Sequence, residues 1–359
     1  MALSSSLPAT LSSLPLRRFI ASLTPLLGVG ALLALGLLAP ALEGVLTLAL
    51  PFFGLIALGY FCARQFDIDE SGLRWMNVFI VYVALPALFF NLISVVPLEK
   101  LANWQFVGTT TSCTALAFAM ALGAGLVASK GNLAEGAIQG VAGAYSNIGY
   151  MGPGLTLAAL GPQAAVPTAL IFVFDSILLF TLVPFLMALA GAEHMTLGQT
   201  TRLVARRILT HPFNIATFVA VCASYGHFVP PPAIGKMLSF LQNAAAPCAL
   251  FTLGVTVSLR PIRRISGVMP VLSFIKLVVH PALVWLMLSL HGDFGRTWTY
   301  TAMLMASLPP ALNVFVLAQQ YHTWVERASA VIVIGTVLSV FTVTLLLYLM
   351  GNRFIPWVL

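Results

Sequence analysis

The chain repeats its own pattern at a constant spacing of 161 residues. Pro51-Phe52 recurs as Pro212-Phe213, and the segment SNIGYMGP at 146–153 falls on SLPPALNV at 307–314. A single identity arises easily by chance in so apolar a chain, but one spacing that serves several different apolar segments is harder to dismiss. If each copy holds an odd number of membrane spans, the second copy must insert upside down. Inverted repeats with an interrupted helix in each half are typical of secondary transporters.

The apolar content of the chain excludes the soluble classes of protein. Hydrophobic residues make up 60% of the sequence and charged residues 8%, so lipid must be the solvent of the core. We therefore predict an all-α polytopic membrane protein, because backbone polar groups in lipid must pair within their own segment. Its length suits ten spans of about 20 residues each. They are expected at 43–62, 74–96, 104–127, 134–160, 164–190, 212–229, 235–258, 268–290, 298–320 and 327–350.

Residues 1–42 lie outside the repeat, and three interpretations of them stay open. They run from a Ser-rich start through Arg17-Arg18 to an apolar stretch at 19–41. A basic flank, an apolar core and small residues at its end are typical of a signal peptide that is removed. The apolar stretch is also long enough to remain as an extra N-terminal membrane helix. A start codon assigned too far upstream would give the same pattern.

Basic residues are distributed unevenly between two sets of loops, and this predicts the orientation of the chain. The loops after the first, third, fifth, seventh and ninth spans are cytoplasmic by the positive-inside rule. Because the basic residues are scattered over short loops, we expect no nucleic acid as a partner. The first set of loops holds ten basic residues, Arg64, Arg74, Lys130, Arg202, Arg206, Arg207, Arg260, Arg263, Arg264 and Arg327, and the second set holds four, Lys100, Lys236, Arg296 and Arg353.

The fourth and the ninth spans carry helix breakers at their middle. Gly149, Gly152 and Pro153 interrupt the fourth span, and Pro309-Pro310 interrupts the ninth. Proline lacks the backbone donor and pushes the residue before it out of the helical region. A single such site can be a simple kink. Two breaks at equivalent positions of a repeat favour a binding site, where side chains, water or ligand satisfy the freed backbone groups.

An anion is the ligand that these breaks favour. The half-helix after each break presents unpaired N–H groups and the positive end of its dipole, and no acidic residue lies near either break. Two asparagines beside the breaks can each donate and accept hydrogen bonds, although they could also serve only to satisfy freed carbonyls. The expected substrate-binding residues are Asn147, Gly149, Tyr150, Gly152, Pro153, Pro309, Pro310 and Asn313.

At these residues the chain resembles the auxin efflux carrier family, whose bacterial members are often described as malonate or organic-acid permeases. The specific matches are SNIGYMGPGL at 146–155 and LPPALNVFVLAQQY at 308–321. More diffuse similarity is found in PFFGLIALGY, LPALFFNLI, APCALFTLGV, KLVVHPAL and ASAVIVIGTVLSVFT, so that the resemblance covers about residues 45–350. Residues 1–42 depart from the family pattern, in which the chain begins just before the first span.

The resemblance implies a fold of ten transmembrane helices in two inverted five-helix repeats, at 43–190 and 212–351, joined by a cytoplasmic linker at 191–211. The first, second, sixth and seventh spans would form a scaffold. The third to fifth and eighth to tenth spans would form a moving transport domain, in which the broken fourth and ninth helices cross at the substrate. By the family pattern Asn147 contacts substrate, and Asn313 matches the asparagine that follows the prolines.

Three ionisable side chains lie well inside apolar spans. Asp175 is mid-way along 164–190, and Lys276 and His280 are one turn apart within 268–290. Charges at membrane depth are costly and indicate function by default, so all three are coupling-ion candidates, with Asp175 the first choice. Lys276 could instead extend its ammonium group to the interface, and His280 could be a hydrogen-bonded core residue.

Neither a cofactor nor a metal site is expected. The four cysteines, Cys62, Cys113, Cys222 and Cys248, lie in or beside apolar spans and form no CxxC pair. No HExxH or GxSxG pattern occurs, so an enzyme is not predicted.

The sequence therefore predicts a secondary active transporter of the inner membrane that moves a small organic anion, such as malonate or an auxin-like acid, by alternating access. No Walker A pattern occurs, so ATP is not the direct energy source, and protons are the natural driver. A sodium-coupled bile-acid-type symporter shares the architecture and is the main alternative; a non-transporting membrane sensor is the alternative from another class. The expected partners are the organic anion, membrane lipid, a proton or sodium ion, and a second copy of the chain in a homodimer.

Overall fold

The computed structural model describes residues 40–97, 99, 102–191, 198–199, 202, 205–206, 209–260 and 265–358. The interpretations of residues 1–42 fall outside this part, except that residues 40–42 form the first turn of a helix. Of the basic residues used for the orientation, Lys100, Arg207, Arg263 and Arg264 also lie outside it.

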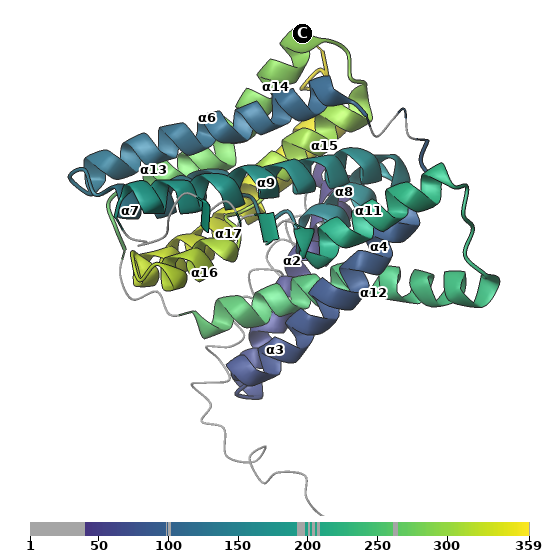
Figure 1. Ribbon diagram of the computed structural model, residues 1–359, viewed down its shortest axis with the longest axis horizontal. Coiled ribbons are helices and arrows are strands. Elements are labelled where there is room, and N and C mark those ends of the chain that lie inside the picture. Colours follow the sequence, from purple (N-terminus) through teal and green to yellow (C-terminus); the bar gives the residue numbers. More distant parts are fainter. Residues whose placement is uncertain are drawn as a thin grey trace, which may run out of the picture.

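The described part of the chain is built from helices (Figure 1). Several apolar segments are divided into two or three consecutive helical pieces, and these divisions locate the functional features discussed below. The helices are α2 (Pro40–Gln65), α3 (Glu70–Phe79), η2 (Ile80–Ala84), α4 (Leu85–Ile93), α6 (Trp104–Ala128), α7 (Leu133–Ala144), α8 (Gly152–Leu160), η3 (Pro162–Ala164), α9 (Ala165–Leu189), α11 (Pro212–Tyr225), α12 (Pro232–Leu259), α13 (Met269–Phe274), η4 (Ile275–Val279), α14 (His280–His291), α15 (Arg296–Ser307), α16 (Asn313–Gln320) and α17 (Val325–Gly351).

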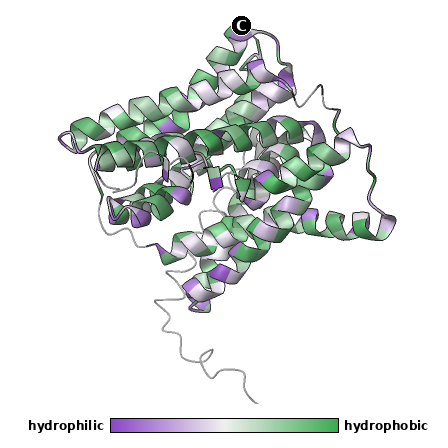
Figure 2. Cartoon of the chain, viewed as in Figure 1, coloured by the Kyte–Doolittle hydropathy of each residue, from purple (hydrophilic) through white to green (hydrophobic). Residues whose placement is uncertain are grey.

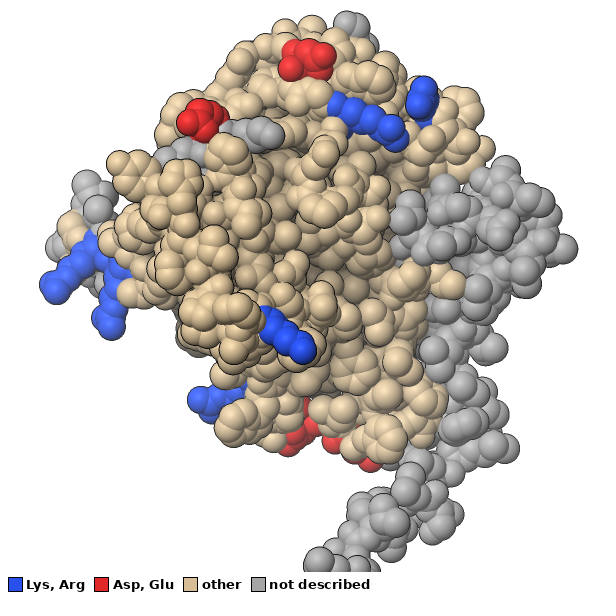
Figure 3. Space-filling model, turned by 90° about the vertical axis from the view of Figure 1, so that its right-hand side faces the viewer, with Lys and Arg blue, Asp and Glu red and all other residues tan. Residues whose placement is uncertain are grey.

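The surface of the molecule suits a lipid environment. Apolar residues cover most of the helix lengths, while hydrophilic residues gather at helix ends and connections (Figure 2). On the face drawn in Figure 3, charged side chains are few and isolated. Six continuous segments of the described chain are long and apolar enough to cross a membrane: Glu70–Ile93, Trp104–Ala128, Pro162–Leu189, Pro232–Leu259, Met269–His291 and Val325–Gly351. The chain is therefore an integral membrane protein.

The helices pack in two groups, which Figure 1 shows in its lower and upper parts. In the first group α2 packs along α12, and α11 packs along α4. In the second group α6 packs on α7, α9 and α14, and α15 packs on α14 and α17. The groups meet where α2 contacts α17, α4 contacts α9, and α12 contacts α8.

Glycine sets the closest helix crossing in the first group. A Cβ atom on Gly254 of α12 would overlap the backbone of Ile56 in α2, and one on Gly59 of α2 would overlap the Phe251 carbonyl of α12. Small residues at such crossings let two backbones approach, which supplies packing where lipid offers no hydrophobic driving force. The α2–α12 contact therefore depends on these two glycines.

Two prolines inside membrane helices produce short π-helical turns. Pro86 follows η2 and Pro281 follows η4, and each lacks the N–H that would continue the α-helical pattern. The turns widen to i→i+5 bonds, from Leu85 N–H to Ile80 O and from His280 N–H to Ile275 O. Such single π-turns occur often at functional sites.

Short polar side chains begin several of the helices. Asp69 caps α3 by accepting hydrogen bonds from the backbone N–H groups of Ser71 and Gly72, and these bonds, the one from Gly72 first, hold the pKa of Asp69 below its usual range. Asn103 and Asn132 cap α6 and α7 in the same way. These caps satisfy N–H groups that the first turn of a helix leaves unpaired.

Candidate functional site

The first helix break lies between α7 and α8, at residues 145–151. α7 ends at Ala144, and Tyr145 turns into an extended conformation with φ −79° and ψ 109°. α8 begins again at Gly152 with Pro153 in its first turn, where the missing proline N–H costs nothing. Pro153 thus starts a helix here rather than kinking one.

The second break lies between α15 and α16, at residues 308–312. Leu308 is extended, with φ −62° and ψ 151°, as expected for a residue that precedes a proline. α16 begins at Asn313. Pro309-Pro310 therefore opens this helix fully, and does not merely bend it.

The two breaks cross and hydrogen-bond to each other. Ser146 and Pro310 form an isolated antiparallel bridge. The Asn147 N–H donates to the Pro309 carbonyl at 2.8 Å, and the Ala311 N–H donates to the Tyr145 carbonyl at 3.0 Å. Each opened strand thus satisfies backbone groups that the other leaves free, which is the condition for non-helical backbone inside a membrane.

Two half-helices follow the breaks: α16 begins directly after the crossing, and α8 begins after a short turn at 148–151. Neither α8 nor α16 has a side-chain cap on its first turn. The positive ends of their dipoles therefore lie beside the crossing, at Gly152 and at Asn313, where they favour an anion. Gly335 of α17 lets that helix lie against the crossing, because a Cβ atom there would overlap the ring of Pro310.

The two asparagines occupy different positions at the crossing. Asn147 is 2% exposed, and its Nδ2 atom has no hydrogen-bond partner among the described residues. Asn313 is half-buried as the first residue of α16 and lies within hydrogen-bonding reach of the Tyr145 hydroxyl. An amide that is buried with unused donors is suited to bind a ligand oxygen.

The glycines and the tyrosine of the first break lie at its edge. Gly149 and Tyr150 are half-buried, and the Tyr150 hydroxyl donates to Asn77 Oδ1 of α3 at 2.8 Å. Gly152 faces Met305, whose sulfur would collide with a Cβ atom at that position. This break thus contacts both helix groups.

The three ionisable residues predicted within spans come together through a fourth residue. Thr114 of α6 places its hydroxyl 3.1 Å from Asp175 Oδ2 and 3.3 Å from His280 Nε2. His280 Nδ1 lies 3.4 Å from Lys276 Nζ. Asp175 of α9, Thr114, His280 and Lys276 are all at most 4% exposed. We call this row of side chains the buried polar chain.

The buried polar chain ends on the backbone of the second break. Lys276 Nζ donates to the carbonyl of Ala306, and the Ser146 hydroxyl donates to the same carbonyl at 3.4 Å. In a continuous helix that carbonyl would accept from residue 310, but Pro310 has no N–H. Lys276, presented by the π-turn η4, therefore replaces the bond that the proline removes.

Sequence patterns pointed to Asp175, Lys276 and His280 but missed the groups that connect them. Thr114 stands in the run TTTSCT, where nothing marks it apart from its neighbours. The Ala306 carbonyl had a detectable signal, because the carbonyl four residues before a proline in a helix always loses its partner.

Arg260, at the end of α12, is a further link between the helix groups that the sequence did not mark. Its guanidinium lies 3.8 Å from the ring centroid of Phe315 in α16, and its Nη1 lies 3.3 Å from Glu70 Oε1 of α3. A cation over an aromatic face is attracted by the ring quadrupole. Arg260 thus connects α12 and α3 to the half-helix that begins at Asn313.

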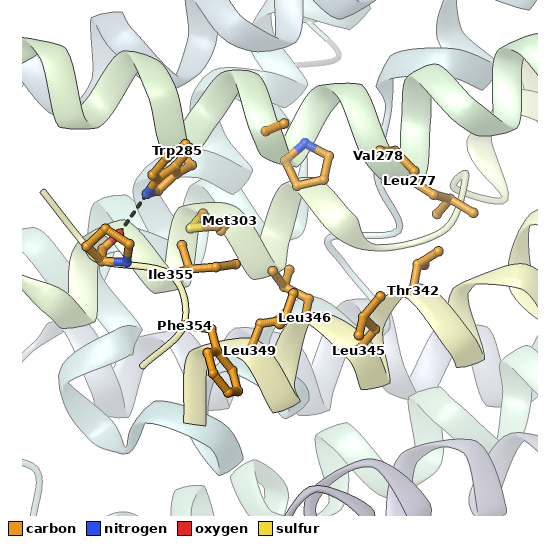
Figure 4. Close-up of a pocket in the computed structure, with 13 residues that line it drawn as sticks. Leu277, Val278, Trp285, Met303, Thr342, Leu345, Leu346, Leu349, Phe354 and Ile355 are labelled. Atoms are coloured by element: carbon orange, nitrogen blue, oxygen red, sulfur yellow. Dashed lines mark hydrogen bonds between the residues drawn. The ribbon is translucent and has the colours of Figure 1, made fainter. Parts of the chain in front are cut away.

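At least two cavities between the described helices lie away from the crossing. A cavity of ≈ 360 Å³ between α14, α17 and the C-terminal segment is lined mainly by apolar side chains such as Leu277, Leu346 and Phe354 (Figure 4). Trp285 closes one end of it by donating to the Pro356 carbonyl at 2.7 Å (Figure 4). A larger cavity of ≈ 1090 Å³ opens where α4 ends and α6, α9 and α15 begin, and it is lined by both groups of helices.

Comparisons with known proteins identify the family of the chain. The family model for membrane transport proteins matches residues 44–347. A provisionally named malonate transporter of Rhizobium meliloti (strain 1021) is 50% identical over 309 residues, which cover 86% of this chain and 97% of the relative. A transporter of Methanothermobacter thermautotrophicus is 24% identical over 81% of this chain and 93% of its own length. Auxin efflux carrier component 4 of Arabidopsis thaliana is 24% identical over 41% of this chain and 25% of its own length. The chain therefore belongs to the membrane transport protein family that includes the auxin efflux carriers, and it is a membrane transporter rather than an enzyme.

Proposed function

We propose that this chain moves a small organic anion across the inner membrane by alternating access, with malonate as the first candidate, and that protons drive the movement. The observation that carries the proposal is the crossing of the two breaks, beside which α8 and α16 both begin without side-chain caps. A carboxylate beside the crossing would be attracted by the positive ends of both half-helix dipoles and would receive the unused amide donors of Asn147. The malonate name of the 50% identical relative makes malonate the first anion to test.

The proposed substrate-binding set keeps the residues expected from the sequence. The asparagine amides would bind carboxylate oxygens directly. Gly149 would let the substrate approach the backbone closely, Gly152 would let Met305 pack beside the first turn of α8, and the prolines would keep the helices open. Tyr150 would lie beside the substrate, because it is half-buried at the edge of the first break. The set consists of Asn147, Gly149, Tyr150, Gly152, Pro153, Pro309, Pro310 and Asn313.

Alternating access in this proposal uses the two helix groups as its parts. α2, α3, α4, α11 and α12 would form a scaffold, and the remaining helices would move with the substrate. Two observations support an inverted repeat behind this division. α8 begins at Gly152 and α16 at Asn313, which are 161 residues apart. The pairs α2–α12 and α11–α4 each join an element of one half to an element of the other, as a pseudo-two-fold axis would require.

Proton coupling is assigned to the buried polar chain. Asp175 is the proposed proton carrier, because its carboxyl group lies in the same second helix group as both breaks and its Oδ1 atom has no partner among the described residues. Thr114, His280 and Lys276 connect that carboxyl group to the Ala306 carbonyl, just before the second break. A change of charge on Asp175 would therefore change the electrostatic potential where the substrate is proposed to bind.

Uptake of labelled malonate into proteoliposomes tests the proposal. We expect accumulation with a proton gradient and only exchange without one, and we expect a sodium gradient to have no effect. Asp175→Asn should abolish proton-driven accumulation and leave malonate exchange in place. Malonate uptake no faster than in empty liposomes would contradict the substrate assignment, and accumulation that follows sodium would favour a sodium-coupled symporter.

A further inference from the structure

The hydroxyl group of Thr114 cannot satisfy all of its neighbours at once. It lies 3.1 Å from Asp175 Oδ2, 3.3 Å from His280 Nε2 and 3.3 Å from the Thr110 carbonyl. A threonine hydroxyl has one hydrogen to donate and two lone pairs. The direction in which this hydrogen points must therefore depend on which neighbours carry protons.

Two arrangements satisfy the whole buried polar chain with the same number of protons. In the charged arrangement Thr114 donates to the Asp175 carboxylate, His280 Nε2–H donates to Thr114, and the Lys276 ammonium donates to His280 Nδ1. In the neutral arrangement the Asp175 carboxyl group donates to Thr114, Thr114 donates to His280 Nε2, and His280 Nδ1–H donates to the Lys276 amine. Lys276 can donate to the Ala306 carbonyl in both arrangements.

We propose that Thr114 relays a proton between Asp175 and His280, so that Asp175 and Lys276 exchange one proton along the buried polar chain without water. Starting from the neutral arrangement, the Asp175 proton moves to Thr114 Oγ1, and the Thr114 proton moves to His280 Nε2. The His280 Nδ1 proton then moves to Lys276 Nζ. One O–H bond of Asp175 is broken and one N–H bond of Lys276 is formed. Thr114 and His280 each end with the same number of protons as at the start.

In the proposed transport cycle, the relay would make the charge near the substrate site depend on where the proton is. This role of the relay rests on the proposed function. The charged arrangement places a full ammonium charge on the Ala306 carbonyl at the second break, and the neutral arrangement removes it. An anion at the crossing is attracted to the charged form, since a nearby cation in a medium of low dielectric constant acts strongly. Proton movement and anion binding are thereby linked through Thr114.

Among the groups around Asp175, Thr114 is the one that connects its carboxyl group directly to His280. The other titratable groups that face Asp175 are Cys113 of α6 and Tyr145 at the end of α7, together with Lys276. The Tyr145 hydroxyl is engaged with Ser176 at 3.3 Å, and the Cys113 thiol with the Leu283 carbonyl at 3.7 Å. Only the Thr114 hydroxyl, among the hydrogen bonds of the described residues, touches both Asp175 and His280.

Three variants of α6 test the relay. Thr114→Val keeps the shape of the side chain and removes its hydroxyl, and Thr114→Ser restores a hydroxyl. Thr110→Val is the matched control, because Thr110 is buried one turn earlier on the same helix and donates only to the backbone carbonyls of Phe106 and Val107. Each variant is reconstituted as the full chain, and malonate counterflow and proton-driven malonate accumulation are measured in parallel.

We expect Thr114→Val to retain counterflow and to lose proton-driven accumulation by about tenfold or more, within the usual range of coupling between sites. Thr114→Ser and Thr110→Val should keep both activities. Wild-type accumulation in Thr114→Val would overturn the relay, and so would a defect in Thr114→Ser equal to that of Thr114→Val. A lack of counterflow in the wild-type protein would instead overturn the proposed function, so the two failures are distinguishable.

A spectroscopic measurement covers the case in which Thr114→Val folds poorly in liposomes. The carboxyl stretching band that Asp175→Asn removes is followed by infrared spectroscopy of the purified protein as pH is changed. We expect the midpoint of that band to move in Thr114→Val and to stay in place in Thr110→Val. An unchanged midpoint in Thr114→Val would overturn the proposal independently of transport.

Discussion

At the scale of single residues, Asn147 has the buried side chain at the crossing that is best suited to bind a ligand. Its backbone N–H holds the second break through Pro309, while its side-chain amide is buried with Nδ2 unpaired among the described residues. An unsatisfied buried polar group costs about 1–3 kcal/mol. A ligand that pairs with this amide would recover that cost, which gives the site affinity and selectivity together.

Asn147→Ala should leave the protein folded and weaken malonate binding by about 1–3 kcal/mol, because a bound carboxylate oxygen loses its buried partner. Isothermal titration of the purified variant with malonate measures the change. Asn352→Ala is the control, since Asn352 is exposed beyond the end of α17 and donates only to the Tyr348 carbonyl. Wild-type affinity in a well-folded Asn147→Ala protein would remove Asn147 from the site.

At the scale of elements, the two broken helices and the close α2–α12 crossing set the geometry on which the site depends. The breaks cross at Ser146 and Pro310, and α8 and α16 begin after them. The crossing holds the first helix group together through backbone contact at Gly59 and Gly254. Elements fixed by glycine and proline in this way tolerate little change in side-chain volume.

Gly254→Ala should destabilise the protein by about 1–3 kcal/mol, the usual cost of overpacking a well-packed contact. The added methyl group would meet the α2 backbone, which cannot move aside as a flexible side chain can. Thermal unfolding in detergent measures the effect. Gly235→Ala, in the same helix α12 with open space at the Cβ position, should unfold no earlier than wild type. Equal stability of the two variants would contradict the close crossing.

The elements also show why sequence reasoning reached the breaks but not the buried polar chain. Pro309-Pro310 and the glycines around Pro153 act locally, so their effect on the backbone follows from the sequence. Thr114 meets Asp175 across 61 residues and His280 across 166 residues, and such contacts depend on how helices pack. The π-turns before Pro86 and Pro281 do not follow from the prolines alone, because Pro51, Pro184 and Pro247 lie inside α-helices that continue through them without a π-turn.

At the scale of the whole molecule, two groups of helices meet at a polar centre inside an apolar body. Arg260 joins Glu70 of one group to Phe315 of the other, and Arg327 joins Glu135 across α17 and α7 at 3.0 Å. Both arginines belong to the loops predicted to be cytoplasmic. The proposed orientation therefore places charged contacts at the cytoplasmic end and the ≈ 1090 Å³ cavity at the opposite end.

The orientation can be tested with single cysteines near the start of α12 and in the segment that follows it. In a background without the four native cysteines, Ile265→Cys should be protected from an impermeant thiol reagent in intact cells, and Lys236→Cys should react. Both positions are exposed, so accessibility depends on the side of the membrane. External labelling at position 265 would reverse the predicted topology.

Alternating access at the crossing can be tested through the reactivity of one cysteine just before α16. Leu312 is half-buried and immediately precedes Asn313. Leu312→Cys, in the same cysteine-free background, is exposed to an impermeant thiol reagent from each side of the membrane, with and without malonate. Val316→Cys, which is 55% exposed on the same helix, is the control. We predict that Leu312→Cys reacts from both sides and that malonate slows its labelling, while labelling of Val316→Cys is indifferent to malonate. Reaction at position 312 from one side only, or at a rate that malonate does not change, would contradict substrate binding at the crossing.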